Sequence, residues 1–260
     1  MQHTKKSGFT LVELAIVLVI IGLIVGGVLA GQDLIKAAEQ RAAVGQIEKM
    51  DTVVNAFRGK YNGIPGDVAN PGSFGFFVPG AVTTQGNGTL DSPVAGRLDG
   101  EPAVFFEHLA RAGLINESIA LAAGEATTTT MTTDMQNYAP ISKLGKGIYI
   151  WAQSDSGSNY YMLDNDDGSF LAATGVITPS LSAMSRITAF NMDAKLDDSV
   201  PNTGKVQAAD NVAGATALST GNTAADLCVD NTVATAHVYL TNTQTNADET
   251  KCALRIKGSF

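Results

Sequence analysis

The sequence predicts an α+β protein in which a long N-terminal helix packs against an antiparallel β-sheet formed by the C-terminal half of the chain. Residues 14–32 form a run of 19 residues without a charged side chain, and a helical spacing of apolar residues continues from there to Tyr61. Beyond residue 146, aromatic and β-branched segments alternate with turn-forming residues. Antiparallel strands packed on one helix form an α+β architecture.

The first helix is expected over residues 9–61, which is about 80 Å at 1.5 Å per residue. Its apolar part is long enough to cross most of a bilayer. The second part carries one apolar stripe at spacings of three and four residues, formed by Ala43, Ile47, Met50, Val54, Phe57 and Tyr61. Gly63 and Pro65 end the helix. Such a helix is too long for its own domain, so its first half must pack against lipid or other helices.

A distinctive motif opens this helix. Residues 5–13 read Lys-Lys-Ser-Gly-Phe-Thr-Leu-Val-Glu, so two cations and a glycine precede the apolar run and a lone acid, Glu13, lies near its start. An ionised carboxylate inside a membrane costs up to about 3 kcal/mol. Such an acid therefore indicates a function and predicts a partner for its charge.

The motif closely resembles the start of a type IV prepilin, a family that includes minor pilins and the pseudopilins of type II secretion. The resemblance covers residues 5–61. It implies cleavage between Gly8 and Phe9 by a prepilin peptidase, followed by N-methylation of Phe9. It also implies a pilin-like roll, and that the carboxylate of Glu13 meets the N-terminal amine of a neighbouring homologous subunit.

The resemblance divides the chain into four parts: a leader at 1–8, an apolar transmembrane and filament-core helix at 9–32, its amphipathic continuation at 33–62, and a periplasmic or extracellular globular head at 63–260. The helix would cross the inner membrane once, until the assembly machinery there packs the subunit into a filament. An ordinary signal peptide with cleavage before Gly31 is the alternative. Glu13 within the apolar region and the unbroken helical pattern after it argue against that alternative.

Four glycines lie in the apolar helix. Gly22 and Gly26, and likewise Gly27 and Gly31, have the spacing that permits close helix approach in an apolar setting. The alternative is a weakened helix, because each glycine costs about 1 kcal/mol relative to alanine. Many major pilins have a proline in this stretch, which this chain lacks, and the glycines could take its place.

The head is expected to contain further short elements. Residues 101–115 predict a helix whose apolar face includes His108, interpreted as a packed core histidine. Residues 164–168 are acidic and typical of a turn, and they do not fit the EF-hand pattern. Other ranges predict a hairpin at 147–152 and 160–163, a helix at 180–193, and strands at 236–240 and 253–256. A long loop is expected at 65–101, and surface loops at 126–133 and 200–227.

The two cysteines, Cys228 and Cys252, predict a single disulfide if the chain is exported. The bond would close a loop of 23 intervening residues and contribute on the order of 3 kcal/mol. The resemblance implies the same, because many pilins carry a C-terminal disulfide-bounded loop. Two free thiols or a metal pair are the alternatives.

A calcium site is a further hypothesis. Asp193, Asp197 and Asp198, with the side-chain oxygens of Asn191 and Asn202, could gather around this ion, which takes six to eight oxygen ligands. Some pseudopilins bind calcium in a loop near the C-terminal side. The alternative is that these residues only form turns.

Composition argues against several classes of function. The net charge is −8, and removal of Lys5 and Lys6 with the leader makes it −10, which disfavours a nucleic-acid partner. The chain has three histidines and no catalytic or phosphate-binding motif, so neither an enzyme nor a cofactor is expected. The favoured function is a minor or variant pilin, with a pseudopilin or a monomeric exported binding protein as alternatives.

Overall fold

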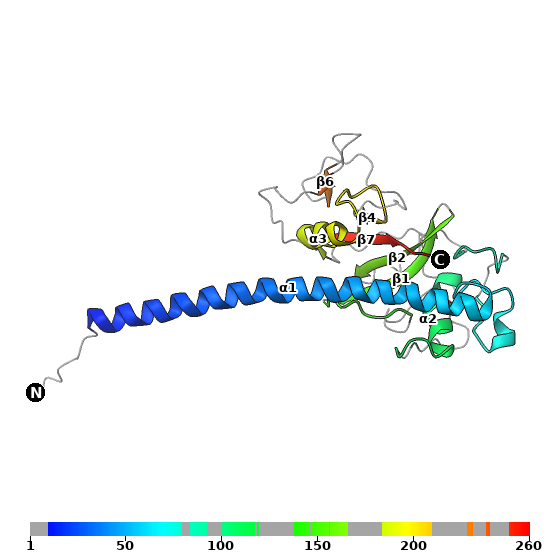
Figure 1. Ribbon diagram of the computed structural model, residues 1–260, viewed down its shortest axis with the longest axis horizontal. Coiled ribbons are helices and arrows are strands. Elements are labelled where there is room, and N and C mark those ends of the chain that lie inside the picture. Colours follow the sequence, from blue (N-terminus) through cyan, green and yellow to red (C-terminus); the bar gives the residue numbers. More distant parts are fainter. Residues whose placement is uncertain are drawn as a thin grey trace, which may run out of the picture.

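The structure is a computed structural model, and its first helix is a rod that projects from a compact head (Figure 1). Helix α1 spans Leu11–Tyr61. The first half of α1 extends away from the head, and the second half lies along it. The structure describes residues 10–79, 84–92, 100–117, 119, 138–145, 147–155, 157–165, 184–209, 228–230, 238–239 and 250–260.

The second half of α1 packs on the head through one stripe. Its buried side chains are Gln40, Ala43, Ile47, Met50, Val54 and Phe57. This confirms the stripe predicted from the spacing, except that Tyr61 is only half-buried. The helix ends at Asn62, which adopts a left-handed conformation with φ of 54° and donates its N–H to the Arg58 carbonyl at 2.9 Å.

The main sheet has five strands, all in antiparallel pairs. They are β1 (Ile148–Asp155), β2 (Ser158–Asn165), β3 (Met184–Ser185), β4 (Val206–Ala209) and β7 (Thr250–Lys257). Strand β7 pairs with β2, β3 and β4, and β2 pairs in turn with β1. The hairpin and the strand predicted around 253–256 are therefore confirmed, as is the α+β arrangement.

Two helices flank this sheet. Helix α2 (Glu101–Arg111) lies against α1 and β1, and α3 (Arg186–Leu196) lies against α1 and β7. Helix α2 ends four residues earlier than predicted, before Gly113 with φ of 69°. A short 3-10 helix, η1 (Pro71–Phe74), lies in the segment after α1. The core between α1, α2 and the sheet includes Phe57, Phe105 and Trp151, all fully buried.

The structure corrects three predictions. The range 200–227 was expected to hold only surface loops, but Val206–Ala209 forms β4 because its backbone pairs with β7. The helix expected at 180–193 begins only at Arg186, after the strand β3, and continues to Leu196. Residues 164 and 165 belong to strand β2 rather than to a turn.

The strand expected at 236–240 is described only at Val238–Tyr239, as β6. It pairs with β5 (Val229–Asp230) in a separate two-stranded sheet. The loop expected at 126–133 lies outside the described residues. Cys228 and Cys252 form the predicted disulfide with Cα atoms 5.1 Å apart, and both are fully buried. The bond joins the start of β5 to the central strand β7.

Candidate functional site

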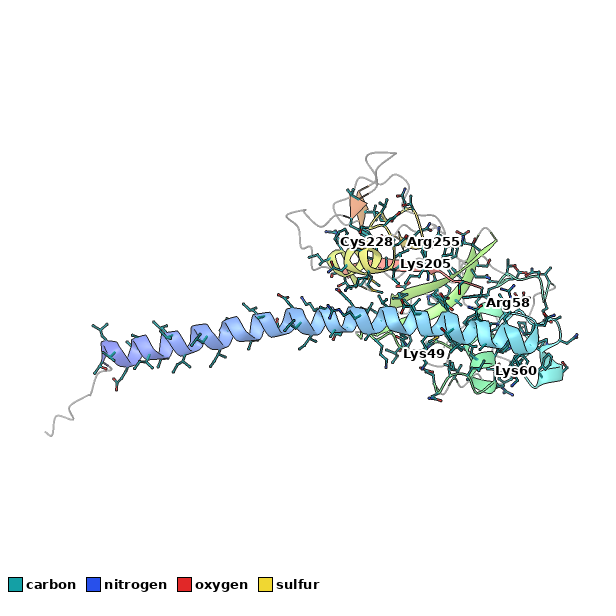
Figure 2. The ribbon with its side chains drawn as sticks, viewed as in Figure 1. Lys49, Arg58, Lys60, Lys205, Cys228 and Arg255 are labelled. Atoms are coloured by element: carbon teal, nitrogen blue, oxygen red, sulfur yellow. A yellow bond between two sulfur atoms is a disulfide. The ribbon has the colours of Figure 1, made fainter. Side chains whose placement is uncertain are left out.

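The first half of α1 is a helix without a packing partner in the single chain. Every residue from Thr10 to Ala30 is exposed, including apolar side chains such as Leu18 at 69%. Figure 2 shows these side chains standing out around the rod on all sides. By length and composition α1 could cross a membrane. An apolar helix with no buried face requires lipid or other helices as its surroundings.

Glu13 is tied to the beginning of this helix. Its Oε2 accepts hydrogen bonds from the Thr10 backbone N–H at 2.8 Å and from the Thr10 hydroxyl at 2.9 Å. The Thr10 Oγ1 in turn accepts from the Glu13 N–H at 3.3 Å, which completes a capping box. This role of Thr10 was not predicted, although the Thr-x-x-Glu spacing is the signature of a capping box. The acid thus caps its own helix and also lies at the positive end of the helix dipole.

The glycines of the apolar run leave parts of the helix surface open. A Cβ atom added at Gly22, Gly26, Gly27 or Gly31 would have no heavy atom within 4 Å beyond the helix's own backbone. These positions would therefore accept a closely packed second helix. Close helix packing through the glycines stays a prediction, since the partner would be another chain.

Comparison with known proteins identifies the class of the N-terminal segment. Residues 3–29 match the family model of the prokaryotic N-terminal methylation motif. The chain is therefore type IV pilin-like in this segment. The motif is that of a pilin or pseudopilin precursor, which is a substrate of prepilin peptidase. No curated protein and no solved structure matches the chain. Gly8 and Phe9, the predicted processing residues, lie outside the described residues.

The acidic residues predicted to bind calcium do come together. Asp193, Asp197 and Asp198 each place a carboxylate oxygen within 4.8 Å of the others, at the C-terminal end of α3. Their oxygens also accept hydrogen bonds from the surrounding turn. Asp193 accepts from the Ser199 N–H at 3.2 Å and from the Tyr239 hydroxyl at 2.8 Å.

The other two carboxylates of this cluster are engaged in the same way. Asp198 accepts from the Val200 N–H at 2.9 Å and from the Thr203 hydroxyl at 2.8 Å. Asp197 accepts from the N–H groups of Lys205 and Val206. Burial, opposed by the Tyr239 hydrogen bond, raises the pKa of Asp193 to about 6. Protein donors thus engage all three carboxylates, as the interpretation of these residues as turn formers expects. Calcium binding at these residues stays a prediction.

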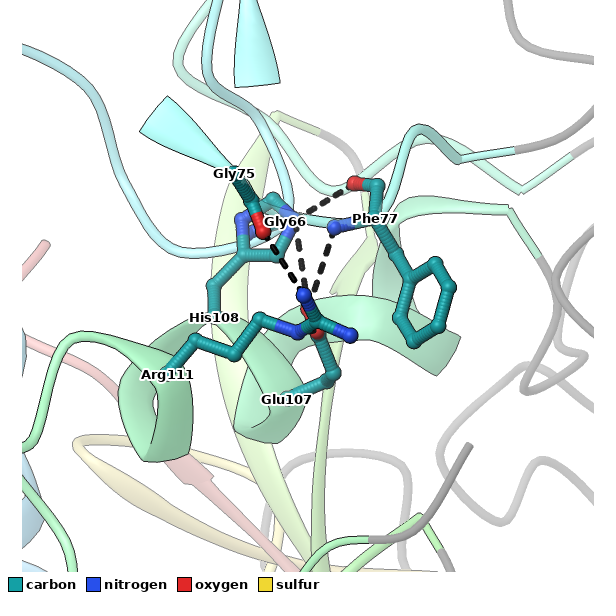
Figure 3. A network of polar contacts seen from close by, with 6 residues as sticks. All are labelled: Gly66, Gly75, Phe77, Glu107, His108 and Arg111. Atoms are coloured by element: carbon teal, nitrogen blue, oxygen red, sulfur yellow. Dashed lines mark hydrogen bonds and ion pairs between the residues drawn. The ribbon is translucent and has the colours of Figure 1, made fainter. Parts of the chain in front are cut away.

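His108 holds a structural position, as interpreted from the sequence. Its ring is fully buried; Nδ1 accepts the Gly66 N–H at 2.9 Å, and Nε2 donates to the Phe77 carbonyl at 2.9 Å (Figure 3). Burial lowers the pKa of His108 to about 4, so the ring is neutral at pH 7. Next to it, Glu107 forms an ion pair with Arg111. This network attaches the segment after α1 to α2.

Proposed function

We propose that this chain is a minor or variant pilin, a structural subunit that is cleaved after Gly8, methylated on Phe9 and assembled through α1 into a type IV pilus. The observation that supports this most is the contrast along α1: residues 10–30 are nearly all apolar and are exposed on every side, whereas the second half buries one stripe of side chains in the head. A helix of this kind serves as a membrane anchor before assembly and as a filament-core helix after it. No catalytic step is part of this function.

Glu13 would specify the contact between subunits. In the single chain the two hydrogen bonds that the Glu13 carboxylate accepts from Thr10 both end at Oε2, and Oε1 accepts no hydrogen bond from the described residues. The amine that cleavage exposes on a neighbouring Phe9 would supply the positive charge that Oε1 lacks. A buried charge is costly when unpaired and much less costly when paired. Subunits would therefore join at the position where the amine and the carboxylate meet.

The first experiment is mass spectrometry of the N-terminal peptide from cells that carry a prepilin peptidase. A mature chain that begins with methylated Phe9 is expected. A chain that begins at Gly31 would show an ordinary signal peptide and overturn the proposal. An uncleaved leader in such cells would overturn it too.

The second experiment substitutes Glu13→Ala. The variant should be inserted in the membrane and processed, but its filament content should fall at least tenfold, because an interior amine then loses its partner. Immunolabelled electron microscopy of sheared surface material measures this. Glu48→Ala is the matched control, since Glu48 is an exposed acid on the same helix outside the apolar run. Wild-type filament levels in Glu13→Ala would contradict the role.

Pseudopilins begin with the same motif, so a pseudopilin of a secretion system is the alternative function. Sheared material without labelled filaments, together with impaired protein secretion on deletion of the gene, would assign the subunit to a secretion system instead of a surface pilus.

A further inference from the structure

Two acids meet inside the head, where the segment after α1 approaches the start of α2. They are Asp67 and Glu101, which are 1% and 0% exposed, and a side-chain hydrogen bond joins their carboxyl groups. The backbones are also close, because a Cβ atom added at Gly66 would lie 2.5 Å from the Glu101 carbonyl oxygen. Gly66 has φ of 87°, so only glycine suits this approach. The fold itself therefore holds these two acids together, and we call them the acid pair.

The contact between the two carboxyl groups requires a proton. An ionised carboxylate only accepts hydrogen bonds, so two ionised acids have no donor to share. Among the residues that the structure describes, no lysine, arginine or histidine side chain forms an ion pair with either acid. Two buried carboxylates at one place repel each other, and the usual outcome is that one of them stays protonated.

Asp67 is the acid that the loop at 84–92 keeps ionised. The Gly88 N–H donates to Asp67 Oδ2 at 2.6 Å, and the N–H groups of Gly86 and Asn87 donate to Oδ1. Hydrogen bonds to the charged form of an acid stabilise that form. Three backbone donors therefore favour the carboxylate of Asp67.

Glu101 is the acid that suits the proton. Its Oε2 accepts the Asp91 N–H at 2.7 Å, but its Oε1 is buried and receives no hydrogen bond from the described part of the chain. Burial raises the pKa of Glu101 to about 8, and the negative charges of Asp67 and Asp91 and the hydrogen bond with Asp67 act in the same direction. The Asp91 N–H opposes these effects without cancelling them.

We propose that Glu101 keeps its proton at neutral pH and donates it to the Asp67 carboxylate, so that the acid pair is a pH-sensitive attachment of α2 to the segment after α1. One proton gives the contact its donor and leaves a single negative charge, which the N–H groups of the loop stabilise. Loss of the proton would remove the hydrogen bond and place two negative charges together in the interior. The acid pair does not depend on filament assembly.

The attachment reaches the sheet through the same loop. Asn159 of β2 accepts the Leu90 N–H at 3.2 Å and donates to the Gly88 carbonyl at 3.0 Å. The loop at 84–92 is thus bonded to Asp67, to Glu101 and to β2 at once. Repulsion between the two acids would therefore loosen this loop together with the start of α2.

The neighbouring groups set the pH range of this change. The charged groups that act on Glu101 are Asp67, from the segment after α1, and Asp91, from the loop. His108, on the same helix, has a pKa lowered by burial to about 4 and is already neutral when Glu101 titrates in the folded chain. Because the folded-state pKa of Glu101 is raised from 4.5 to about 8, the folded chain binds this proton more tightly than the unfolded chain. The resulting stability is lost as pH rises towards 8.

Infrared spectroscopy of the purified full-length chain, in a detergent without ester or carboxyl groups, observes the proton directly. At pH 7 the spectrum of the wild type minus that of Glu101→Gln should contain the carbonyl stretching band of a neutral carboxylic acid. The band should disappear as pH rises past about 8. If the variant does not fold, the wild-type spectrum at pH 7 minus its own spectrum at high pH shows the same band. Absence of the band would overturn the proposal.

Denaturant titration at several pH values measures the linked stability. Glu101→Gln keeps the side-chain shape, and its amide nitrogen can donate to Asp67 at every pH. From about pH 5.5 to about pH 7.5, the unfolding equilibrium constant of the wild type should rise about tenfold per pH unit relative to that of the variant, because unfolding releases this one proton. The matched control is Glu117→Gln, at an exposed acid shortly after α2, and it should follow the wild type. Parallel curves for Glu101→Gln and the wild type would overturn the proposal.

Hydrogen exchange of residues 84–92, corrected for the intrinsic effect of pH on exchange, tests the attachment itself. Protection of this loop in the wild type should fall above about pH 8, and protection in Glu101→Gln should not. Wild-type protection that stays constant through this range would show that the acid pair does not attach the loop, and would overturn the pH-sensitive attachment.

Discussion

The two halves of α1 belong to one continuous helix but are adapted to different surroundings. From Thr10 to Ala30 every residue is exposed and nearly all are apolar, whereas from Gln40 to Phe57 the apolar side chains form a single buried stripe with polar residues around it. The continuity of the helix therefore does not indicate what surrounds each half. The distribution of apolar residues around the helix axis indicates it. The half without a polar face must find its packing partners outside the chain, and the half with one folds against its own head.

The largest expected contrast between the halves is in core packing. Phe57→Ala should lower the free energy of unfolding of the head by about 3–5 kcal/mol, because it removes a fully buried aromatic ring. Leu18→Ala is the control in the exposed half and should change it by less than about 0.5 kcal/mol. Denaturant titration followed by the fluorescence of Trp151, the only tryptophan and fully buried, measures the head alone. Equal effects of the two substitutions would refute the division of α1.

The disulfide should affect the stability of the head and not the attachment of the chain to the membrane. Replacing Cys228 and Cys252 together with serine should destabilise the head by about 3 kcal/mol, because the bond closes a loop of 23 intervening residues. Extraction of the variant from membranes should require detergent, as for the wild type. A variant released by salt or alkaline washing would mean that the head contributes to anchoring.

The smallest of the three effects concerns pH. Because the folded-state pKa of His108 is lowered to about 4 from its ordinary 6.5, the unfolded chain binds the proton more readily, and stability falls as pH drops from 6.5 towards 4. Between pH 7 and pH 5 the loss is about 2 kcal/mol. Protonated Nδ1 also no longer accepts the Gly66 N–H.

This pH effect is read from the difference between the wild type and His108→Asn, since the buried acids Asp193 and Glu101 contribute with the opposite sign in an overlapping range. The wild type should lose more stability than the variant on acidification. Parallel stability curves for the two proteins would contradict the neutral buried histidine. The exposed half of α1 should show no such dependence in either protein.

Local patterns in the sequence predicted the elements that local patterns determine. The spacing of apolar residues identified the buried face of α1, two β-branched and aromatic segments separated by turn-forming residues identified the β1–β2 hairpin, and the cysteine pair identified the disulfide. The predicted boundaries of the elements were less accurate, as at the start of α3. The Thr10–Glu13 capping box was visible in the spacing and was overlooked.

The features that could not be predicted depend on distant partners. Strand β4 is a short segment of small residues, and its pairing with β7 across about fifty residues of chain makes it a strand. The hydrogen bonds that join Asp67 and Glu101 to the loop at 84–92 likewise form only when the segment after α1, this loop and the start of α2 meet. In both cases each residue is unremarkable in its own sequence context, and tertiary structure gives it its role.

The bond between Cys228 and Cys252 also sets an order of events. It fastens the small β5–β6 sheet to the central strand of the main sheet, and thiols of this kind stay reduced in the cytosol. In the proposed pilin, the head would reach its final form only after delivery to an oxidising compartment, at a stage when α1 would already anchor the subunit in the membrane. Oxidation would thus separate immature subunits from those ready for use, at a stage when every copy is still tethered.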